Sequence, residues 1–167
     1  MDLSIEIVKK EEKEILRNLF EKYRYEFSQY DNLDVNYLGL YGYDYFDCYW
    51  TDENRYPYFI KVDNKLAGFA MVCDYQDYKV NTKYTMGEYF IMYKYRRYGI
   101  GKKAAFYIFD RLKGKWQLKI HPKNNVSELF WIKIIDEYTK GKYEIIKNAE
   151  GTGYDNEENG HIILFET

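Results

Sequence analysis

A β-rich run, a basic glycine turn and an apolar helix follow one another without interruption between residues 84 and 112. Residues 84–92 form the run, residues 93–101 form the turn, and apolar residues at helical spacing continue to a stop at Gly114. A strand that enters a helix through glycines presents unpaired backbone N–H groups at the positive end of the helix dipole, and these groups suit an anion. Five cations surround the turn with no acid between them: Lys94, Arg96, Arg97, Lys102 and Lys103. The segment therefore predicts a strand and helix that pack together around a local anion site.

Periodicity elsewhere predicts the remaining strands and helices. Apolar runs and alternations predict strands at residues 3–8, 56–62, 66–75, 116–120, 143–148 and 161–165, with a hairpin turn at residues 63–65. Helical spacing predicts helices at residues 11–30 and 126–138, whereas residues 25–54 lose this periodicity. The order of these elements predicts an α/β fold with a mixed sheet.

Length, charge and cysteine content narrow the class of protein. The 167 residues predict one domain over residues 1–167. A net charge of -2 excludes a global basic field, so we expect neither nucleic acid nor a membrane surface as a partner. No apolar run approaches the roughly 18 residues of a membrane span, and the first residues lack a signal-peptide pattern. Because Cys48 and Cys73 fit neither a zinc spacing nor a disulfide framework, we expect a cytoplasmic, reduced protein without a metal.

Three templates for anion binding compete for the glycine turn. A nucleotide P-loop needs four residues between its glycines and a closing Gly-Lys-Ser/Thr, and residues 99–103 have neither. The dinucleotide fingerprint G-x-G-x-x-G/A matches residues 99–104, but it opens a doubly wound sheet and has an acid about 20 residues later, where this chain has His121. Too little chain follows the turn to build such a sheet.

Two motifs carry the third template. Residues 96–101, Arg-Arg-Tyr-Gly-Ile-Gly, resemble the Q/R-x-x-G-x-G/A signature of the GNAT N-acetyltransferases. Residues 124–131 resemble the N-x-x-A-x-x-x-Y helix of that family, with Asn124, Ser127 and Trp131 at its three defined positions. Residues 87–133 are similar to an uncharacterised bacterial branch. The resemblance covers residues 84–138 in sequence, and the preceding residues only in the order of their elements.

The resemblance implies acetyl-CoA as cosubstrate and a mostly antiparallel sheet whose two central strands splay apart. In the family, the signature cradles the pyrophosphate and a splayed strand pairs with the pantetheine. By analogy, backbone N–H groups of residues 97–102 would hold the pyrophosphate, a Met92 N–H would face the thioester oxygen, and Asn124 would contact the pantetheine. The expected cofactor-binding residues are Phe90, Ile91, Met92, Arg96, Arg97, Tyr98, Gly99, Ile100, Gly101, Lys102, Asn124, Ser127 and Trp131.

The implied reaction, direct acetyl transfer to a primary amine, requires a base. An amine like that of lysine has a reference pKa of about 10.4 and is charged at neutral pH. Glu88 lies on the same strand face as Phe90 and Met92 by period-two alternation, near where many family members place a catalytic Glu. His121, with an ordinary pKa near 6.5, is the alternative base. A surface or cross-strand-paired carboxylate and a structural histidine are the competing interpretations.

The proton donor to the departing thiolate is where the chain departs from the family pattern. Trp131 occupies the usual tyrosine position, and an indole N–H does not give up a proton near neutral pH. Tyr138, another tyrosine or water would then serve, and Trp131 with its neighbour Phe130 would belong to the core.

Residues 25–54 combine tyrosines with carboxylates and lack Lys and Arg up to Asn54, a composition that suits a cationic, partly apolar acceptor such as a small-molecule or peptide amine. A solvated, tyrosine-rich lid is the competing interpretation. This segment and the final strands are also two candidate homodimer surfaces. Two other functions stay open: a CoA-binding module that has lost catalysis, and a nucleotide- or nucleic-acid-binding regulator that uses the same basic turn.

Overall fold

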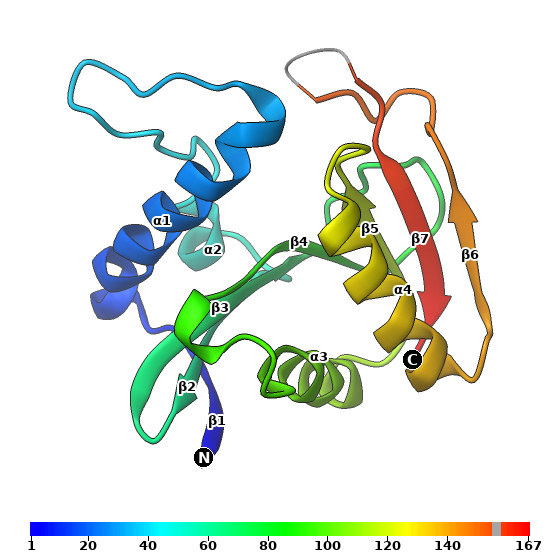
Figure 1. Ribbon diagram of the computed structural model, residues 1–167, viewed down its shortest axis with the longest axis horizontal. Coiled ribbons are helices and arrows are strands. Elements are labelled where there is room, and N and C mark those ends of the chain that lie inside the picture. Colours follow the sequence, from blue (N-terminus) through cyan, green and yellow to red (C-terminus); the bar gives the residue numbers. More distant parts are fainter. Residues whose placement is uncertain (155–157) are drawn as a thin grey trace.

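A seven-stranded sheet forms the centre of the computed structural model, which describes residues 1–154 and 158–167. The strand order is β1-β2-β3-β4-β5-β7-β6, and every neighbouring pair is antiparallel except β4 and β5. The strands are β1 (Leu3–Ile7), β2 (Tyr56–Val62), β3 (Lys65–Cys73), β4 (Tyr84–Ile91), β5 (Lys115–Ile120), β6 (Tyr143–Ile146) and β7 (His161–Glu166). The predicted α/β class with a mixed sheet is confirmed (Figure 1).

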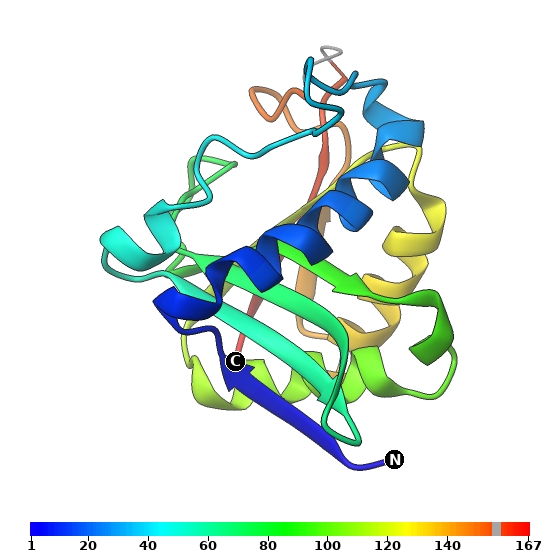
Figure 2. The same cartoon turned by 90° about the vertical axis from the view of Figure 1, so that its left-hand side faces the viewer.

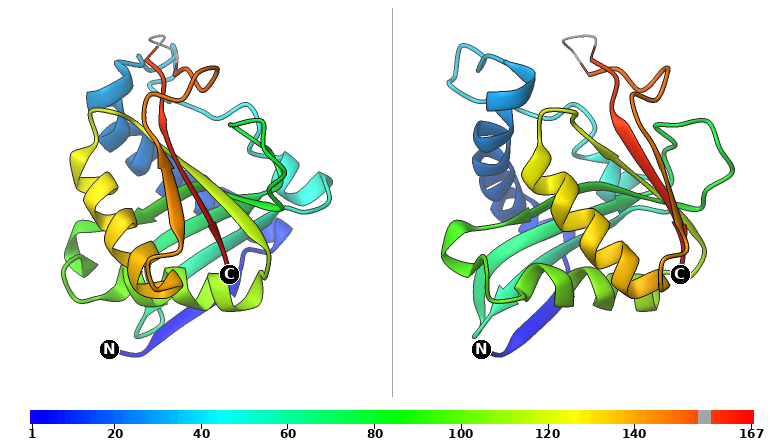
Figure 3. Two further views of the ribbon diagram at one scale, coloured as in Figure 1. Left: turned by 90° about the vertical axis from the view of Figure 1, so that its right-hand side faces the viewer. Right: turned by 45° about the vertical axis from the view of Figure 1, so that its right-hand side comes forward.

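Helices cover both faces of this sheet. The α-helices are α1 (Lys13–Asp31), α2 (Cys48–Thr51), α3 (Ile100–Arg111) and α4 (Asn125–Thr139), and the short 3-10 turns are η1 (Lys10–Glu12) and η2 (Tyr93–Tyr95). Figure 2 shows α1 crossing the face formed by β2, β3 and β4. Figure 3 shows α4 alongside β5, β6 and β7, with α3 running below them. Among the described residues, none of the helices has the length and apolar character needed to cross a membrane.

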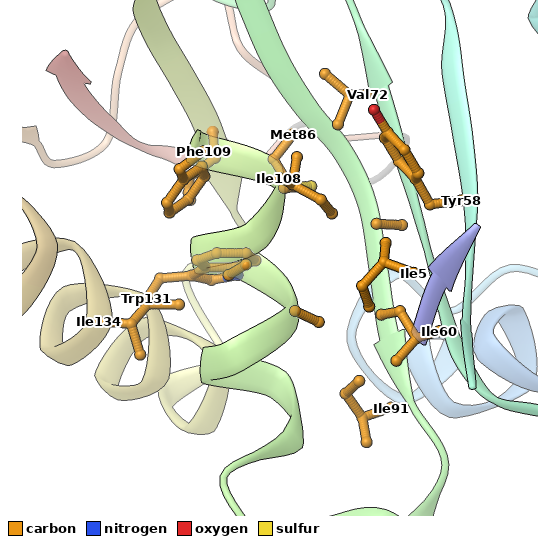
Figure 4. Packing of buried hydrophobic residues seen from close by; sticks show 14 of the residues in the cluster. Ile5, Tyr58, Ile60, Val72, Met86, Ile91, Ile108, Phe109, Trp131 and Ile134 are labelled. Carbon is orange, nitrogen blue, oxygen red and sulfur yellow. The ribbon is translucent and has the colours of Figure 1, made fainter. Parts of the chain in front are cut away.

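Two hydrophobic cores lie on opposite faces of the sheet. The core under α1 contains Leu16 and Phe20 from the helix, and Phe69 and Phe90 from β3 and β4. The larger core under α3 and α4 contains β-branched and aromatic side chains of every strand except the edge strand β6. Figure 4 shows Trp131 extending from α4 toward α3 within this core. Because successive strand residues point to opposite faces, neighbouring residues such as Phe90 and Ile91 belong to different cores.

Local turn chemistry explains where several elements end. Asp63 and Asn64 both have positive φ, 49° and 60°, which matches the twist of a tight β2–β3 hairpin and confirms the predicted turn. Helix α3 ends at Arg111, and Gly114, with φ of 147°, turns the chain into β5. Most predicted ends lie within two residues of the observed ones. Residues 32–47 form no helix or strand, as the loss of periodicity predicts.

A splay separates β4 from β5. The two strands pair only through Tyr84 with Trp116 and Thr85 with Gln117, although β4 continues for six more residues. On its other edge, β4 pairs with β3 along its whole length, apart from a bulge at Gly87. The far half of β4 therefore has one open edge, and this edge leads into η2 and the glycine turn.

Candidate functional site

The N-terminus of α3 presents backbone donors that have no partner within the helix. Gly99 is the N-cap in the left-handed region, with φ of 74°, and no side chain caps the helix. The first intrahelical bond runs from the Lys103 N–H to the Gly99 carbonyl at 3.1 Å, which leaves the N–H groups of residues 100–102 unused by the helix. Arg97 is also left-handed, with φ of 67°. Consecutive amides in such a turn form a concavity suited to phosphate.

The cations around the turn play different parts. Arg97 and Lys103 are exposed, and no carboxylate of the described residues lies within ion-pair distance of either one. Lys102 pairs with Glu137 of α4 at 2.8 Å and so ties the two helices together. Tyr98, also expected at the cofactor, is 60% exposed beside them. Two cations are thus available to an anion at the α3 N-terminus.

Arg96 is a structural tie, which corrects its expected role at the cofactor. Its Nε donates to the Ile91 carbonyl at 2.6 Å, and its terminal nitrogen donates to Glu26 Oε2 of α1 at 2.8 Å. The Arg96 backbone N–H is also used, by the Tyr93 carbonyl at 3.1 Å. Because its guanidinium donates both to the Ile91 carbonyl and to Glu26, Arg96 holds α1 against the start of the turn and has few N–H groups left to bind a ligand.

Packing rather than backbone conformation favours glycine at position 101. A Cβ at this position would lie 3.1 Å from the Phe130 ring and 3.5 Å from Ile91 Cγ1. The Tyr89 hydroxyl donates to the Gly101 carbonyl at 2.5 Å, and the Tyr89 ring lies 6.1 Å from that of Phe130. These contacts fix the first turn of α3 against β4 and α4.

The open edge of β4 presents different amides from those expected. The Met92 N–H donates to the Ala67 carbonyl of β3 at 2.8 Å, so the prediction that this amide faces the thioester is wrong. Residues of an antiparallel pair alternate between bonding to the neighbour and facing away from it. The Tyr89 and Ile91 amides therefore face the splay, and in agreement the Ile91 carbonyl is reached by Arg96 rather than by β3. The prediction was wrong by one residue.

The second motif begins α4. Asn124 is its N-cap, and the Asn124 Oδ1 accepts the Ser127 N–H at 3.0 Å. Among the described residues, no hydrogen bond uses the Asn124 Nδ2. Trp131 is 5% exposed and packs edge-on against Tyr89, with ring centroids 5.0 Å apart, so it belongs to the core. Its burial agrees with the interpretation of residues 130–131 as hydrophobic core.

Glu88 lies beneath α1 on the face opposite α3, together with Phe90. Burial raises the pKa of Glu88 to about 7, although a hydrogen bond from the Tyr23 hydroxyl lowers it. Tyr23 and Asp77 act on Glu88 electrostatically, as do the cations Arg24 and Lys119, which lower its pKa. We call Glu88, Tyr23, Asp77 and the three tyrosines whose pKa values Glu88 raises the Glu88 cluster; those tyrosines are Tyr43, Tyr49 and Tyr154. A carboxyl group half-protonated at neutral pH is suited to accept a proton there.

His121, the alternative base, lies at the end of β5 with a 1% exposed side chain. Its Nδ1 accepts the Lys123 N–H at 3.1 Å, and its Nε2 lies 3.5 Å from Glu158 Oε2. The ring stacks on Tyr30 and lies 4.6 Å from the Tyr154 ring. Burial lowers its pKa, so the imidazole is neutral at pH 7 and closely packed.

Tyr138 lies too far along α4 to donate a proton at the splay, and this prediction is wrong. Its hydroxyl donates to Asp110 Oδ1 at 2.7 Å and accepts from Lys113 Nζ at 2.8 Å, both at the C-terminal end of α3. Gly99 lies at the opposite end of that helix, eleven residues or about 16 Å from Asp110 along its axis. Tyr138 therefore joins the C-terminal end of α4 to the C-terminal end of α3.

The tyrosine-rich segment contributes less to the site than its composition predicts. Tyr43 and Tyr49 join the Glu88 cluster, but Tyr25, Tyr37 and Tyr45 are exposed. Sequence analysis missed Tyr23, Asp77 and Tyr154. Tyr23 was visible only as an apolar position of a helix, whereas Asp77 and Tyr154 lie in loops that no periodicity places. Part of the loop that carries Tyr154, residues 155–157, lies outside the described residues.

A cleft of about 750 Å³ lies on the Glu88 face of β4, between α1, residues 35–41 and η2. Phe90, Met92 and Tyr93 line one wall, while Tyr25 of α1 and Leu40 line the other. Its volume is within the range of small-molecule sites. In the described residues, no group of three or more His, Cys, Asp or Glu side chains is arranged to hold a metal ion.

The family follows from a match that covers most of the chain. A model described as "Acetyltransferase (GNAT) family" matches residues 14–134, from the start of α1 to the middle of α4. The chain belongs to the GNAT acetyltransferase family. The match includes β4, the glycine turn, α3 and the Asn124 helix, so both motifs identified above lie within the GNAT region. No curated protein matches the chain in sequence.

Solved structures show the same GNAT fold at low sequence identity. A GNAT acetyltransferase from Streptococcus agalactiae matches with a TM-score of 0.69 at 15% identity over 99% of this chain and 95% of that one. The PaiA N-acetyltransferase of Thermoplasma acidophilum, in complex with coenzyme A, has a TM-score of 0.61 at 13% identity over all of both chains. The diaminobutyrate acetyltransferase EctA of Paenibacillus lautus, in complex with its substrate and coenzyme A, has a TM-score of 0.64 at 13% identity over 99% and 95%.

Proposed function

We propose that this GNAT chain is an N-acetyltransferase that moves the acetyl group of acetyl-CoA to a primary amine by direct attack. The observation that carries the proposal is the position of Glu88. It is a half-buried carboxyl with a pKa of about 7, on the strand whose open edge leads into an uncapped helix N-terminus. A base on the splayed strand and an anion site just beyond the end of that strand are what amine acetylation requires.

The backbone amides that α3 leaves unused at its N-terminus are suited to bind the phosphates of acetyl-CoA. The N–H groups of residues 100–102 would bind the pyrophosphate, with Arg97 and Lys103 adding charge. The Tyr89 and Ile91 amides would bond to the pantetheine or thioester oxygen, and Asn124 Nδ2 would reach the pantetheine from α4. Acetyl-CoA supplies an activated thioester.

Glu88 would accept the proton of the incoming ammonium. Tyr23 holds the carboxylate in place through its hydroxyl, and the Tyr43 and Tyr49 rings keep the surroundings poor in water. His121 stays an alternative base, but its close packing and its bond from the Lys123 N–H favour an orienting role. Another tyrosine or water remains as the candidate for protonating the thiolate.

The first test is calorimetric titration with acetyl-CoA, with NADH and ATP as controls. We expect selective acetyl-CoA binding, followed by release of CoA in the presence of an amine panel. Binding of ATP or NADH in preference to acetyl-CoA would contradict the proposal, as would a complete absence of acetyl-CoA binding.

A CoA-binding module without turnover is the second candidate, and one observation favours it. Trp131 is buried at the position of the family tyrosine, and Tyr138 lies at the far end of α3. Neither side chain supplies an acidic hydroxyl at the splay. Acetyl-CoA binding without turnover of any amine would support this module, and sustained turnover would exclude it.

A further inference from the structure

The cleft beside β4 lies on the strand face that carries Glu88, and the lining residue nearest to Glu88 along that strand is Phe90. Phe90 and Met92 line the cleft and share a strand face with Glu88. Four residues of strand separate Glu88 from Met92, a distance of about 13 Å. An acceptor with its amine at Glu88 would therefore lay its body along Phe90 and into the cleft.

The carboxylates of the cleft are already used by the protein. Glu21 accepts the Tyr41 N–H at 2.9 Å with one oxygen and the Gly42 N–H at 2.8 Å with the other. Glu26 pairs with Arg96 at 2.8 Å. These bonds hold residues 41–42 and the start of the turn against α1. Arg96 neutralises Glu26, whereas Glu21 is held by two neutral amides and keeps its negative charge.

The cations of the cleft are not neutralised in the same way. Lys22 and Lys94 both line it, and within the described parts of the chain no carboxylate lies at ion-pair distance from either of them. Lys22 Nζ is 3.3 Å from the Asn18 carbonyl of its own helix, and Lys94 Nζ lies 5.4 Å from the Tyr95 ring centre. The cleft thus presents positive charge at its rim and apolar or aromatic walls within.

Two other carboxylates close to the Glu88 cluster are already paired with cations. Asp31 pairs with Arg24 at 3.1 Å, and Asp77 lies 3.5 Å from Lys119. Glu88 instead has the Tyr23 hydroxyl as its hydrogen-bond partner, while Arg24 and Lys119 act on it electrostatically. Among the described residues of the cleft, a second ammonium group on the acceptor would meet two unpaired lysines, Lys22 and Lys94, against one carboxylate without a cation, Glu21.

We propose that the acceptor is a small amphipathic monoamine: a primary amine at one end of an apolar body and an anionic group at the other. This inference rests on the proposed function. The amine binds at Glu88, the apolar body packs on Phe90, Met92 and the cleft tyrosines, and the anion pairs with Lys22 and Lys94. Polyamines and aminoglycosides, which carry several ammonium groups, do not fit this distribution of charge.

Three amines of equal chain length test the distal group: 8-aminooctanoate, octylamine and 1,8-diaminooctane. We expect kcat/KM to fall in that order, with about tenfold or more between the first and the last. Calorimetry on the CoA-bound protein should give the same order of affinity. Equal use of the three, or a preference for the diamine, overturns the inference.

Charge reversal tests the two lysines. The double variant Lys22→Glu/Lys94→Glu should reverse the preference in favour of the diamine, through KM for the amine, with KM for acetyl-CoA unchanged. Lys142→Glu, an exposed site between α4 and β6, is the matched control and should leave the order as it is. An unchanged order in the double variant contradicts the assignment of the cleft, as does a change confined to KM for acetyl-CoA.

The same amine panel separates the two proposals. Acetylation of polycationic amines but not of 8-aminooctanoate overturns this inference and leaves the acetyltransferase function standing. Failure to acetylate any amine, with acetyl-CoA binding intact, overturns both.

Discussion

Glu88 is the residue whose surroundings most directly predict a measurable pH dependence. Its carboxyl has a pKa of about 7 because it is buried, and only the ionised form accepts a proton from an ammonium group. We expect kcat/KM to fall about tenfold per pH unit below 7 and to level off above it. Glu88→Gln should lower the plateau by about 10²–10⁴-fold and remove the inflection. Steady-state rates between pH 5.5 and 9 measure both effects.

Glu144→Gln, on the exposed side of the edge strand β6, serves as the control and should keep the wild-type profile. An inflection near pH 7 that survives in Glu88→Gln would assign the proton acceptor to His121 or water instead.

The same carboxyl links stability to pH with a definite sign. Its pKa in the folded chain lies above the ordinary 4.5, so the folded state binds the proton more tightly than the unfolded state. The wild type should therefore lose stability relative to Glu88→Gln as pH rises from about 4.5 to 7, by about 3 kcal/mol in all. Urea denaturation of both proteins at a series of pH values measures this difference. A constant difference would show that Glu88 is not buried as described.

Tyr23 tunes Glu88 through one hydrogen bond. Its hydroxyl donates to the carboxylate and favours the charged form, so Tyr23→Phe should move the inflection in kcat/KM above pH 7. Tyr43→Phe removes a hydroxyl from the same cluster without removing that bond, and should shift the inflection less. A downward shift in Tyr23→Phe would contradict the arrangement.

At the scale of elements, β4, the turn and α3 form the unit that we propose binds the anion, and glycine substitutions test it. Gly99 has open space around it, so a side chain there meets no atom within 4 Å. Gly99→Asn adds an uncharged side chain that tolerates positive φ, whereas Gly99→Asp adds a negative charge where a phosphate would bind. We expect Gly99→Asp to bind acetyl-CoA about tenfold or more weakly than Gly99→Asn, measured by calorimetry. Equal affinities would remove the turn from the site.

This unit is also where sequence was most informative. The order of strand, glycine turn and apolar helix is local, so the elements of residues 84–114 followed from periodicity and turn chemistry, and the anion site at the turn stays a prediction. The Met92 amide was misassigned because the period of a strand gives alternation but not which edge faces the neighbour. Tyr138 was misassigned because two turns of α4 carry it about 10 Å beyond Trp131. Asp77 and Tyr154 come from loops whose positions depend on long-range contacts that one sequence does not reveal.

At the scale of the whole molecule, Arg96 joins the α1 layer to the α3 side of the sheet. It bonds to Glu26 of α1 and to the Ile91 carbonyl, so Arg96→Ala should lower the free energy of unfolding by about 1–3 kcal/mol. The exposed neighbour Arg97 offers a matched control. Arg97→Ala should leave stability within about 0.5 kcal/mol and weaken acetyl-CoA binding instead. Urea denaturation and calorimetry separate the two roles, and an equal loss of stability in both variants would contradict them.

Along its open edge, β4 has backbone groups that are not bonded to β5. Amide protons of Tyr89 and Ile91 face the gap, and we expect them to exchange with solvent faster than that of Met92 until a pantetheine chain bonds to them. A ligand that binds only the folded chain also shifts the folding equilibrium by mass action. The lifetime of this protein in a cell would then follow the local supply of acetyl-CoA, so that its abundance would register the metabolic state of the cell.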